Sequence, residues 1–267
     1  LVAGLDGNEC QQIVDLSGEP VSVAWSPDGT RLAYTDSGGL WMYTFGADSP
    51  WQRLLANDSG ASDPLAVRVY ADPRWSPDGV RLLVSVGGYE SASPGVVEVA
   101  TGELTELAGL LTGDSAWTDD GRVLTWVAQW GFDAPGLFRL DPANPQTPPQ
   151  TLLAAPVTDV VQGADGRWYV AVNSSSRLGP QFVRTLEAET PDGPFTPLSE
   201  RGGGFVQMPQ LIAGPDGVVL AAGLRGAAAG PTMRGELMLV DMRTGQTARF
   251  ETPAPVHNVR WGPVLEQ

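Results

Sequence analysis

The sequence predicts an all-β protein: a six-bladed β-propeller of four-stranded antiparallel blades, with one composite blade closed by both termini. Three observations predict this class. A tryptophan-centred turn motif recurs along the whole 267 residues. Apolar residues alternate with polar ones on both sides of the clearest copies, as in half-buried strands. Turn formers are abundant, with 33 glycines and 23 prolines, and no helical period is sustained.

The motif Trp25-Ser26-Pro27-Asp28-Gly29 returns as Trp75-Ser76-Pro77-Asp78-Gly79. Further copies diverge progressively at residues 117–121, 162–166 and 213–217, and a half-copy occupies 261–263. The glycines that end the five whole copies are 50, 42, 45 and 51 residues apart, a period that suits one propeller blade. Proline presets φ, aspartate bonds nearby backbone and glycine accepts positive φ, so each copy predicts a hairpin between the first two strands of a blade.

Apolar runs after each turn supply the remaining strands of a single domain, residues 1–267. Third strands are expected at 40–45, 96–99, 137–140, 182–186 and 237–240, and fourth strands at 53–56, 104–107, 151–154, 195–198 and 247–251. Whole blades then occupy about 20–66, 67–110, 111–155, 156–205 and 206–255. The composite blade takes 1–19 and 256–267, with an innermost strand at 256–261 and outer strands at 1–5 and 11–16. Joining the two ends leaves no open sheet edge.

The first turn and the residues after it, Thr30-Arg31-Leu32-Ala33-Tyr34, resemble the TolB-like propeller repeat. That repeat occurs in TolB, in the propellers of prolyl-oligopeptidase-type peptidases, and in many bacterial surface proteins and lipoproteins. The resemblance implies a bacterial, extracytoplasmic protein, periplasmic or at the cell surface, and we expect this domain to be part of a longer protein. It indicates a fold more strongly than an activity.

Charge and residue usage exclude several functions. The chain has 31 acidic and 16 basic residues, and its net charge of −15 repels nucleic acid and anionic membranes. No apolar run in the sequence is long enough for direct membrane insertion. All basic residues are arginine, which excludes a catalytic lysine. Cys10 and His257 are the only cysteine and histidine, so disulfides and clustered His or Cys metal ligands are excluded, and no Gly-x-Ser-x-Gly motif accompanies the histidine.

Two functions remain, and the scarcity of histidine favours the first. The first function is that of a non-catalytic binding or scaffold propeller, a monomeric domain that recognises a protein, peptide or glycan. The alternative is a hydrolase or lactonase-type enzyme with a divalent cation bound in the channel. We expect no catalytic residues and no cofactor under the first function, whereas oxygen ligands alone under the second would suit Ca²⁺.

The partner-binding face is expected to carry the connections between second and third strands, together with those from the fourth strand to the first strand of the next blade. The first set supplies the candidate contacts. The sequence predicts long connections of uneven length at 87–94, 129–135, 174–180 and 225–235. The corresponding connection of the first whole blade, 36–39, is predicted to be short. Such variation favours recognition, although tolerated insertions are the alternative. The candidate contacts are aromatic and arginine residues: Tyr89, Trp130, Phe132, Arg177, Arg225 and Arg234.

A second candidate site lies three residues before the tryptophan position of each repeat. Polar residues occupy it in all six copies: Ser22, Asp72, Asp114, Asp159, Gln210 and Asn258. Because the innermost strand of a blade begins beside the channel, these side chains predict a polar ring at the channel mouth. We expect a water-filled mouth. The alternatives are a cation held by Asp72, Asp114 and Asp159, or side chains that cap their own strands through local backbone hydrogen bonds.

Overall fold

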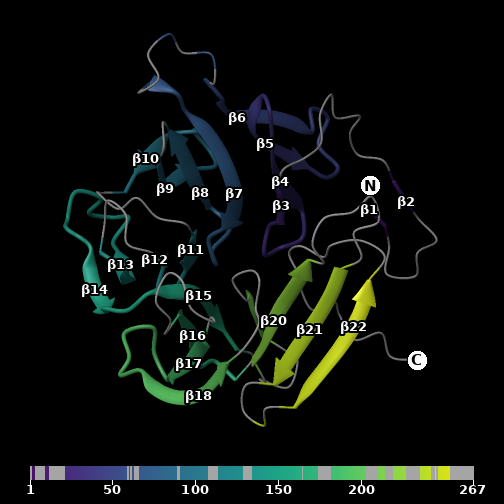
Figure 1. Ribbon diagram of the computed structural model, residues 1–267. Helices are drawn as coiled ribbons and strands as arrows, with labels where there is room; N and C mark the ends of the chain where they lie inside the picture. Colours follow the sequence, from purple (N-terminus) through teal and green to yellow (C-terminus); the bar gives the residue numbers. More distant parts are fainter. Residues whose placement is uncertain are drawn as a thin grey trace. The chain divides into compact units, whose positions relative to one another are not determined.

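The computed structural model contains two compact units, Leu1–Glu106 and Leu107–Gln267, here called the N-terminal and C-terminal units. It describes residues 2–3, 10–11, 22–58, 60, 62, 66–88, 91–107, 114–128, 134–163, 165–173, 182–202, 210–213, 219–226, 235–241, 244 and 246–252. This part of the chain forms five four-stranded antiparallel sheets and one two-stranded pair (Figure 1). None of its helices is long and apolar enough to cross a membrane.

The N-terminal unit contains two of the four-stranded sheets. Sheet 1 consists of β3 (Ser22–Trp25), β4 (Arg31–Asp36), β5 (Gly39–Thr44) and β6 (Trp51–Ala56). Sheet 2 consists of β7 (Val69–Trp75), β8 (Arg81–Gly88), β9 (Ser91–Glu98) and β10 (Leu104–Glu106). A short pair, β1 (Val2–Ala3) and β2 (Cys10–Gln11), precedes them. Each strand of a sheet pairs with its successor in the chain, so both sheets are meanders.

The C-terminal unit contains three meanders of the same kind. Sheet 3 consists of β11 (Asp114–Trp117), β12 (Val123–Val127), β13 (Gly136–Leu140) and β14 (Gln150–Leu153). Sheet 4 consists of β15 (Val157–Gln162), β16 (Trp168–Asn173), β17 (Phe182–Ala188) and β18 (Thr196–Gly202). Sheet 5 consists of β19 (Gln210–Ala213), β20 (Val219–Gly226), β21 (Gly235–Asp241) and β22 (Thr247–Thr252).

The all-β class and the four-stranded antiparallel sheets are confirmed. The prediction of a long connection at 87–94 is wrong, because residues 87–88 belong to β8 and 91–94 to β9, with Ser85 paired to Pro94. Here strand pairing overrides a local composition of glycine, serine and proline that is typical of a loop. At the N-terminus the described part of the second strand is Cys10–Gln11. The strand expected at 256–261 lies outside the described residues, so the composite blade and the number six stay predictions.

The turns between the first and second strands are alike in sheets 1 to 4. In sheet 1 the Ser26 N–H donates to the Arg31 carbonyl and the Gly29 N–H to the Ser26 carbonyl, each at 2.9 Å. Gly29 has a φ of 70°, which a side chain would make unfavourable. Equivalent backbone pairs close the turns of the other three sheets: Ser76 with Arg81, Thr118 with Arg122, and Gly163 with Arg167. The turn geometry therefore persists where the tryptophan, serine and proline of the motif are lost.

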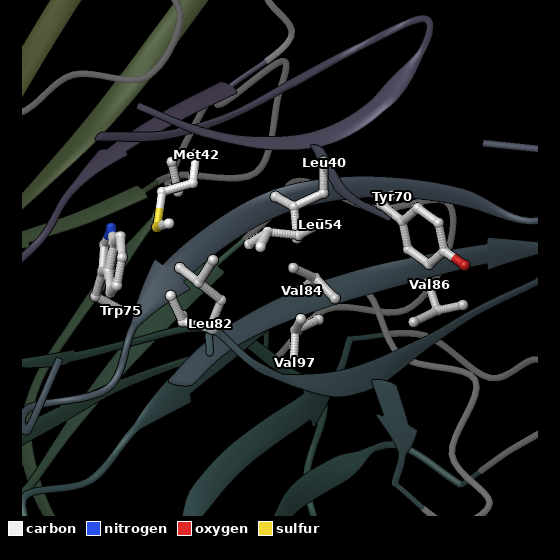
Figure 2. Packing of buried hydrophobic residues seen from close by; sticks show 11 residues of the cluster. Leu40, Met42, Leu54, Tyr70, Trp75, Leu82, Val84, Val86 and Val97 are labelled. Atoms are coloured by element: carbon white, nitrogen blue, oxygen red, sulfur yellow. The ribbon is translucent and has the colours of Figure 1, made fainter. Parts of the chain in front are cut away.

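Sheets 1 and 2 pack face to face over one apolar core (Figure 2). Sheet 1 contributes chiefly Leu40 and Met42, while sheet 2 contributes Trp75, Leu82 and Val84, all of them buried. In the C-terminal unit the corresponding core joins Leu124, Trp126 and Leu137 of sheet 3 to Val157, Val160, Trp168, Val170, Val172 and Leu186 of sheet 4. Each fully buried large side chain contributes about 1.5–3 kcal/mol, so packing between sheets stabilises each unit.

Candidate functional site

The polar positions of the predicted ring fall on the first strand of each four-stranded sheet wherever the structure describes them. Ser22, Asp114 and Gln210 begin β3, β11 and β19, and Asp72 and Asp159 lie within β7 and β15. Gln210 pairs with Ala222 through the backbone. Asn258 lies outside the described residues. The two units are separate bodies, so convergence of these positions on one channel mouth stays a prediction.

In the N-terminal unit the ring positions join sheet 1 to sheet 2. The Ser22 Oγ accepts a hydrogen bond from the Asp72 N–H at 3.0 Å and lies 2.9 Å from the Thr35 Oγ1. Asp72 has a φ of 51°, and the pairing of β7 with β8 shifts in register between Ala71 and Arg74. Aspartate tolerates this left-handed conformation better than most residues. The Ser22 hydroxyl therefore stabilises the backbone of β7 where its pairing is irregular, and Asp72 is exposed.

In the C-terminal unit the ring carboxylates accept hydrogen bonds from the backbone. The Asp159 Oδ1 accepts from the Val160 N–H at 2.8 Å, and its Oδ2 accepts from the Leu211 N–H at 2.5 Å, which joins sheet 4 to sheet 5. The Asp114 Oδ1 accepts from the Ser115 N–H at 2.8 Å. Local backbone bonds, one of the alternatives raised by the sequence, are thus present at both aspartates.

The described residues contain no group of three His, Cys, Asp or Glu side chains placed to hold a metal ion. Asp72 belongs to the N-terminal unit, and Asp114 and Asp159 belong to the C-terminal unit. A cation shared by these three carboxylates therefore stays a prediction. His257, the only histidine, lies outside the described residues.

A second set of contacts joins sheets 1 and 2 through the repeat residues themselves. The Trp75 indole Nε1 donates to the Ala24 carbonyl at 3.0 Å, and Trp75 is 8% exposed. The Arg31 Nη2 donates to the Gly79 carbonyl at 2.8 Å, and its guanidinium lies 4.6 Å from the centre of the Trp75 ring. Trp75 is therefore packed between sheets 1 and 2, whereas its repeat equivalent Trp25 is 46% exposed. The contribution of Arg31 was not predicted, although an arginine follows within two residues of the glycine in the first four copies of the turn motif.

Sheet 1 carries a continuous aromatic surface on the side opposite the sheet 1–sheet 2 core. Strand pairing aligns Trp25 with Leu32, Leu32 with Tyr43 and Tyr43 with Trp51, and in the next row Val23 with Tyr34 and Tyr34 with Trp41. We call this surface the aromatic face; its rings belong to Trp25, Tyr34, Trp41, Tyr43, Phe45 and Trp51. Their centroids are linked in a chain by separations between 4.5 and 6.3 Å. This face was not predicted, although the period-two spacing of Trp41, Tyr43 and Phe45 was its signal.

Two clear pKa shifts accompany these features, and neither brings a group near neutral pH. Burial, and then the negative charge of Asp36, raise the pKa of Tyr34 to about 12. Hydrogen bonds from the Ser26 hydroxyl and from Thr30 lower the pKa of Asp28 to about 2. Neither group is therefore poised as a general acid or base at pH 7.

The connections between second and third strands differ sharply between the two units. In sheets 1 and 2 they are two residues long, 37–38 and 89–90. In sheets 3, 4 and 5 eight residues separate the bounds of the two strands in the chain, 128–135, 174–181 and 227–234, and of these only 128, 134 and 135 are among the described residues. Five candidate contact residues lie outside the described residues: Tyr89, Trp130, Phe132, Arg177 and Arg234. Arg225 was predicted in a connection, but it lies in β20, because that strand extends to Gly226. It pairs there with Glu236 of β21.

No protein-family model matches this chain, and no curated protein matches it. Solved structures do. TolB from Acinetobacter baumannii matches with a TM-score of 0.60 and 16% identity, over 95% of this chain and 59% of that one. Oligogalacturonate lyase from Vibrio parahaemolyticus matches with a TM-score of 0.64 and 12% identity, over 92% and 69%. The Cps50 (Swd1) β-propeller domain of Myceliophteria thermophila matches with a TM-score of 0.61 and 14% identity, over 96% and 80%.

These likenesses concern the fold alone, because every identity is low. This chain spans 59% of the length of the Acinetobacter TolB. Since proteins of different function share the likeness, activity has to be argued from the residues of this chain. The comparisons support a β-propeller fold like that of TolB.

Proposed function

We propose that this chain is a non-catalytic recognition or scaffold domain that binds a protein, peptide or glycan at the ends of its sheets where second strands pass to third strands. The observation that carries the proposal is the contrast in these connections, two residues in sheets 1 and 2 and eight in sheets 3 to 5. The turns between first and second strands are closed by equivalent backbone hydrogen bonds in sheets 1 to 4, and their lengths differ by only one residue. Longer connections in only three sheets are not needed for the fold, whereas a recognition surface needs them.

The three long connections of the C-terminal unit supply most of the proposed contacts. Trp130 and Phe132 lie in 128–135, Arg177 in 174–181 and Arg234 in 227–234, with Arg225 at the end of β20. Tyr89 contributes from the two-residue connection of sheet 2. Aromatic and arginine side chains combine large contact area with directed hydrogen bonds, which suits a peptide or glycan as well as a folded protein.

The proposal places this surface on a monomeric six-bladed propeller, residues 1–267, of which 1–19 and 256–267 form the closing blade. The polar positions of the innermost strands then line a water-filled channel mouth. The TolB-like fold is the reason to propose an extracytoplasmic location within a longer bacterial protein. Removing 256–267 should expose a sheet edge and promote aggregation, and an unchanged, monomeric truncated protein would contradict closure.

Binding is tested with the full chain as bait in an extracytoplasmic fraction and on peptide and glycan arrays. The affinity for the ligand found is then measured for Trp130→Ala and Arg177→Ala. We expect each change to weaken binding about tenfold or more while the melting temperature stays unchanged. Val80→Ala, an exposed site in a turn at the opposite end of sheet 2, is the control and should bind like the parent. Unchanged affinity in both variants would exclude this surface.

A channel-bound cation and an associated hydrolase or lactonase activity form the second candidate. One comparison favours it: an oligogalacturonate lyase in complex with manganese matches with a TM-score of 0.56 and 14% identity, over 85% of this chain and 63% of that one. Calorimetric titration of the full chain with Ca²⁺ and Mn²⁺ decides between the candidates. Heat of binding that is present in the parent chain and absent in Asp114→Ala would support a bound cation. No heat and no shift in the melting temperature of the parent chain would exclude this candidate. Asp159 is unsuitable for this test because its two oxygens hold backbone N–H groups.

A further inference from the structure

Asp72 lies where the first strand of sheet 2 is irregular. The pairing of β7 with β8 shifts between Ala71 and Arg74, so residues 72–73 of β7 lie opposite a single residue of β8. Among the described residues Asp72 is the only one other than glycine with a positive φ, 51°. A residue before proline ordinarily takes an extended conformation, and Pro73 follows, so this conformation is unfavourable on two counts. Bulges of this kind redirect a side chain and are common beside functional sites.

Two hydroxyl groups of sheet 1 hold the backbone of Asp72 in this conformation. The Asp72 N–H donates to the Ser22 Oγ at 3.0 Å, and this Oγ lies 2.9 Å from the Thr35 Oγ1. Thr35 is completely buried, so the hydroxyl that orients Ser22 is fixed by the packing of its own sheet. The position of Asp72 is therefore set by the fold before any ligand arrives.

The carboxylate of Asp72 differs from those of its repeat equivalents. The Asp114 carboxylate accepts the N–H of the next residue, and the Asp159 carboxylate accepts the N–H of the next residue and of Leu211. Asp72 is exposed, and its side chain makes no hydrogen bond or ion pair with the described residues. Glycine would take the same φ without strain. An aspartate that costs stability and gives sheet 2 no described contact in return is better explained by a ligand than by the fold.

We propose that Asp72 binds a positively charged side chain, arginine above all, of the protein or peptide that this domain recognises. The inference rests on the proposed function and specifies the chemistry of its partner. A guanidinium can donate to both oxygens of a carboxylate, and the net charge of −15 attracts a cationic partner. A divalent cation fits less well, because it needs several oxygen ligands and the described residues contain no group of three His, Cys, Asp or Glu side chains placed to supply them.

Two short peptides test this proposal: acetyl-Gly-Arg-Gly-amide, and the same peptide with citrulline, which has the shape of arginine without its charge. Binding to the full chain is followed in NMR spectra by the shift of the Ser22 amide signal. We expect the arginine peptide to bind about threefold or more tightly than the citrulline peptide. In Asp72→Asn the two affinities should become equal. Asparagine also tolerates a positive φ, so this variant should melt like the parent.

Asp48→Asn is the matched control, because it removes the same charge from an exposed aspartate in the turn between β5 and β6. It should bind both peptides within about twofold of the parent. Ser22→Ala keeps the Asp72 carboxylate but removes the hydroxyl that positions it, so it should weaken the arginine peptide about twofold or more and leave the citrulline peptide unchanged.

Equal affinity of the parent for the two peptides would overturn the proposal, and so would equal losses in Asp72→Asn and Asp48→Asn. A shift of the Ser22 signal with Ca²⁺ and with neither peptide would also overturn it, in favour of a bound cation. Failure here leaves the proposed binding surface standing, because that surface is tested separately at Trp130 and Arg177. Unchanged affinity in those two variants would in turn leave the Asp72 measurements as they are.

Discussion

The two units build the same meander but join their sheets by different means. In the N-terminal unit, sheets 1 and 2 meet through a buried tryptophan, an arginine stacked on it and a serine hydroxyl: Trp75, Arg31 and Ser22. In the C-terminal unit, Asp159 joins sheet 4 to sheet 5, and an ion pair between Arg139 and Asp192 joins sheet 3 to sheet 4. Both units also bury an apolar core between neighbouring sheets. The difference therefore lies in the polar contacts beside that core, which use an indole, a hydroxyl and one arginine in the N-terminal unit and carboxylates in the C-terminal unit.

The same two units differ at the ends of their sheets. The connections between second and third strands are short in the N-terminal unit and long in the C-terminal unit. The unit whose sequence stays close to the repeat motif is thus also the one with minimal connections. We infer that the N-terminal unit is specialised for the fold and the C-terminal unit for recognition.

Trp75→Ala should break the N-terminal junction and produce the largest effect. It removes a buried indole together with its hydrogen bond to the Ala24 carbonyl and the support for Arg31, so we expect a loss of about 3–5 kcal/mol in the free energy of unfolding. Asp159→Ala should cost less, about 1.5–3 kcal/mol, because it leaves two backbone N–H groups without their charged acceptor. Urea denaturation measures both.

Conservative variants separate the causes in the two junctions. Trp75→Phe keeps most of the packing and loses the N–H donor, so about 1 kcal/mol is expected. Asp159→Asn keeps an acceptor oxygen and should recover part of the loss of Asp159→Ala. If Asp159→Ala costs more than Trp75→Ala, the expectation that the buried indole contributes more to stability than the hydrogen bonds of the Asp159 carboxylate is wrong.

Local sequence predicted the repeated elements well, because each turn is stabilised within five residues. The Ser26 hydroxyl donates to Asp28 at 2.6 Å and accepts from the Arg31 N–H at 2.9 Å, and such bonds depend only on neighbours in the chain. The Asp159 bond to Leu211, 52 residues away, depends on how two sheets pack, and nothing in the local sequence reveals it. The loop predicted at 87–94 failed for the same reason, because long-range strand pairing outweighed its turn-like composition.

The motif turns of the N-terminal unit should also make its stability sensitive to acid. The pKa of Asp28 is lowered from 3.8 to about 2, and that of Asp78 is lowered as well, chiefly by hydrogen bonds from Ser26 and Ser76. A carboxyl whose pKa is depressed by folding stabilises the folded state above its unfolded pKa. That contribution is lost as pH falls through the folded value, here from about 4 to about 2.

Asp28→Asn should therefore flatten the fall of the melting temperature across this acid range. Thr30→Ala, which removes one of the hydrogen bonds to the carboxylate, should flatten it less, because the bond from Ser26 remains. Melting curves at closely spaced pH values measure both slopes. Slopes identical to that of the parent in both variants would show that the turn carboxylate has no part in acid sensitivity.

The smallest effect on stability, and a large one on binding, is expected from shortening a connection in sheet 3. In sheet 1, Asp36 pairs with Gly39 across a two-residue connection, and in sheet 3 Val127 pairs with Gly136 across eight residues. Replacing 128–135 by Asn-Gly should close the same pair of strands without moving either, since this dipeptide suits a two-residue hairpin. A shorter loop changes the free energy of unfolding by no more than about 1 kcal/mol, while the loss of Trp130 and Phe132 should lower partner affinity at least about tenfold.

The reverse graft tests the assignment of roles to the two units. In the chain already shortened in sheet 3, the residues of 128–135 are inserted in place of 37–38. This graft should neither destabilise sheet 1 strongly nor restore binding. Recovery of binding would mean that one connection suffices and that the three of the C-terminal unit do not act together.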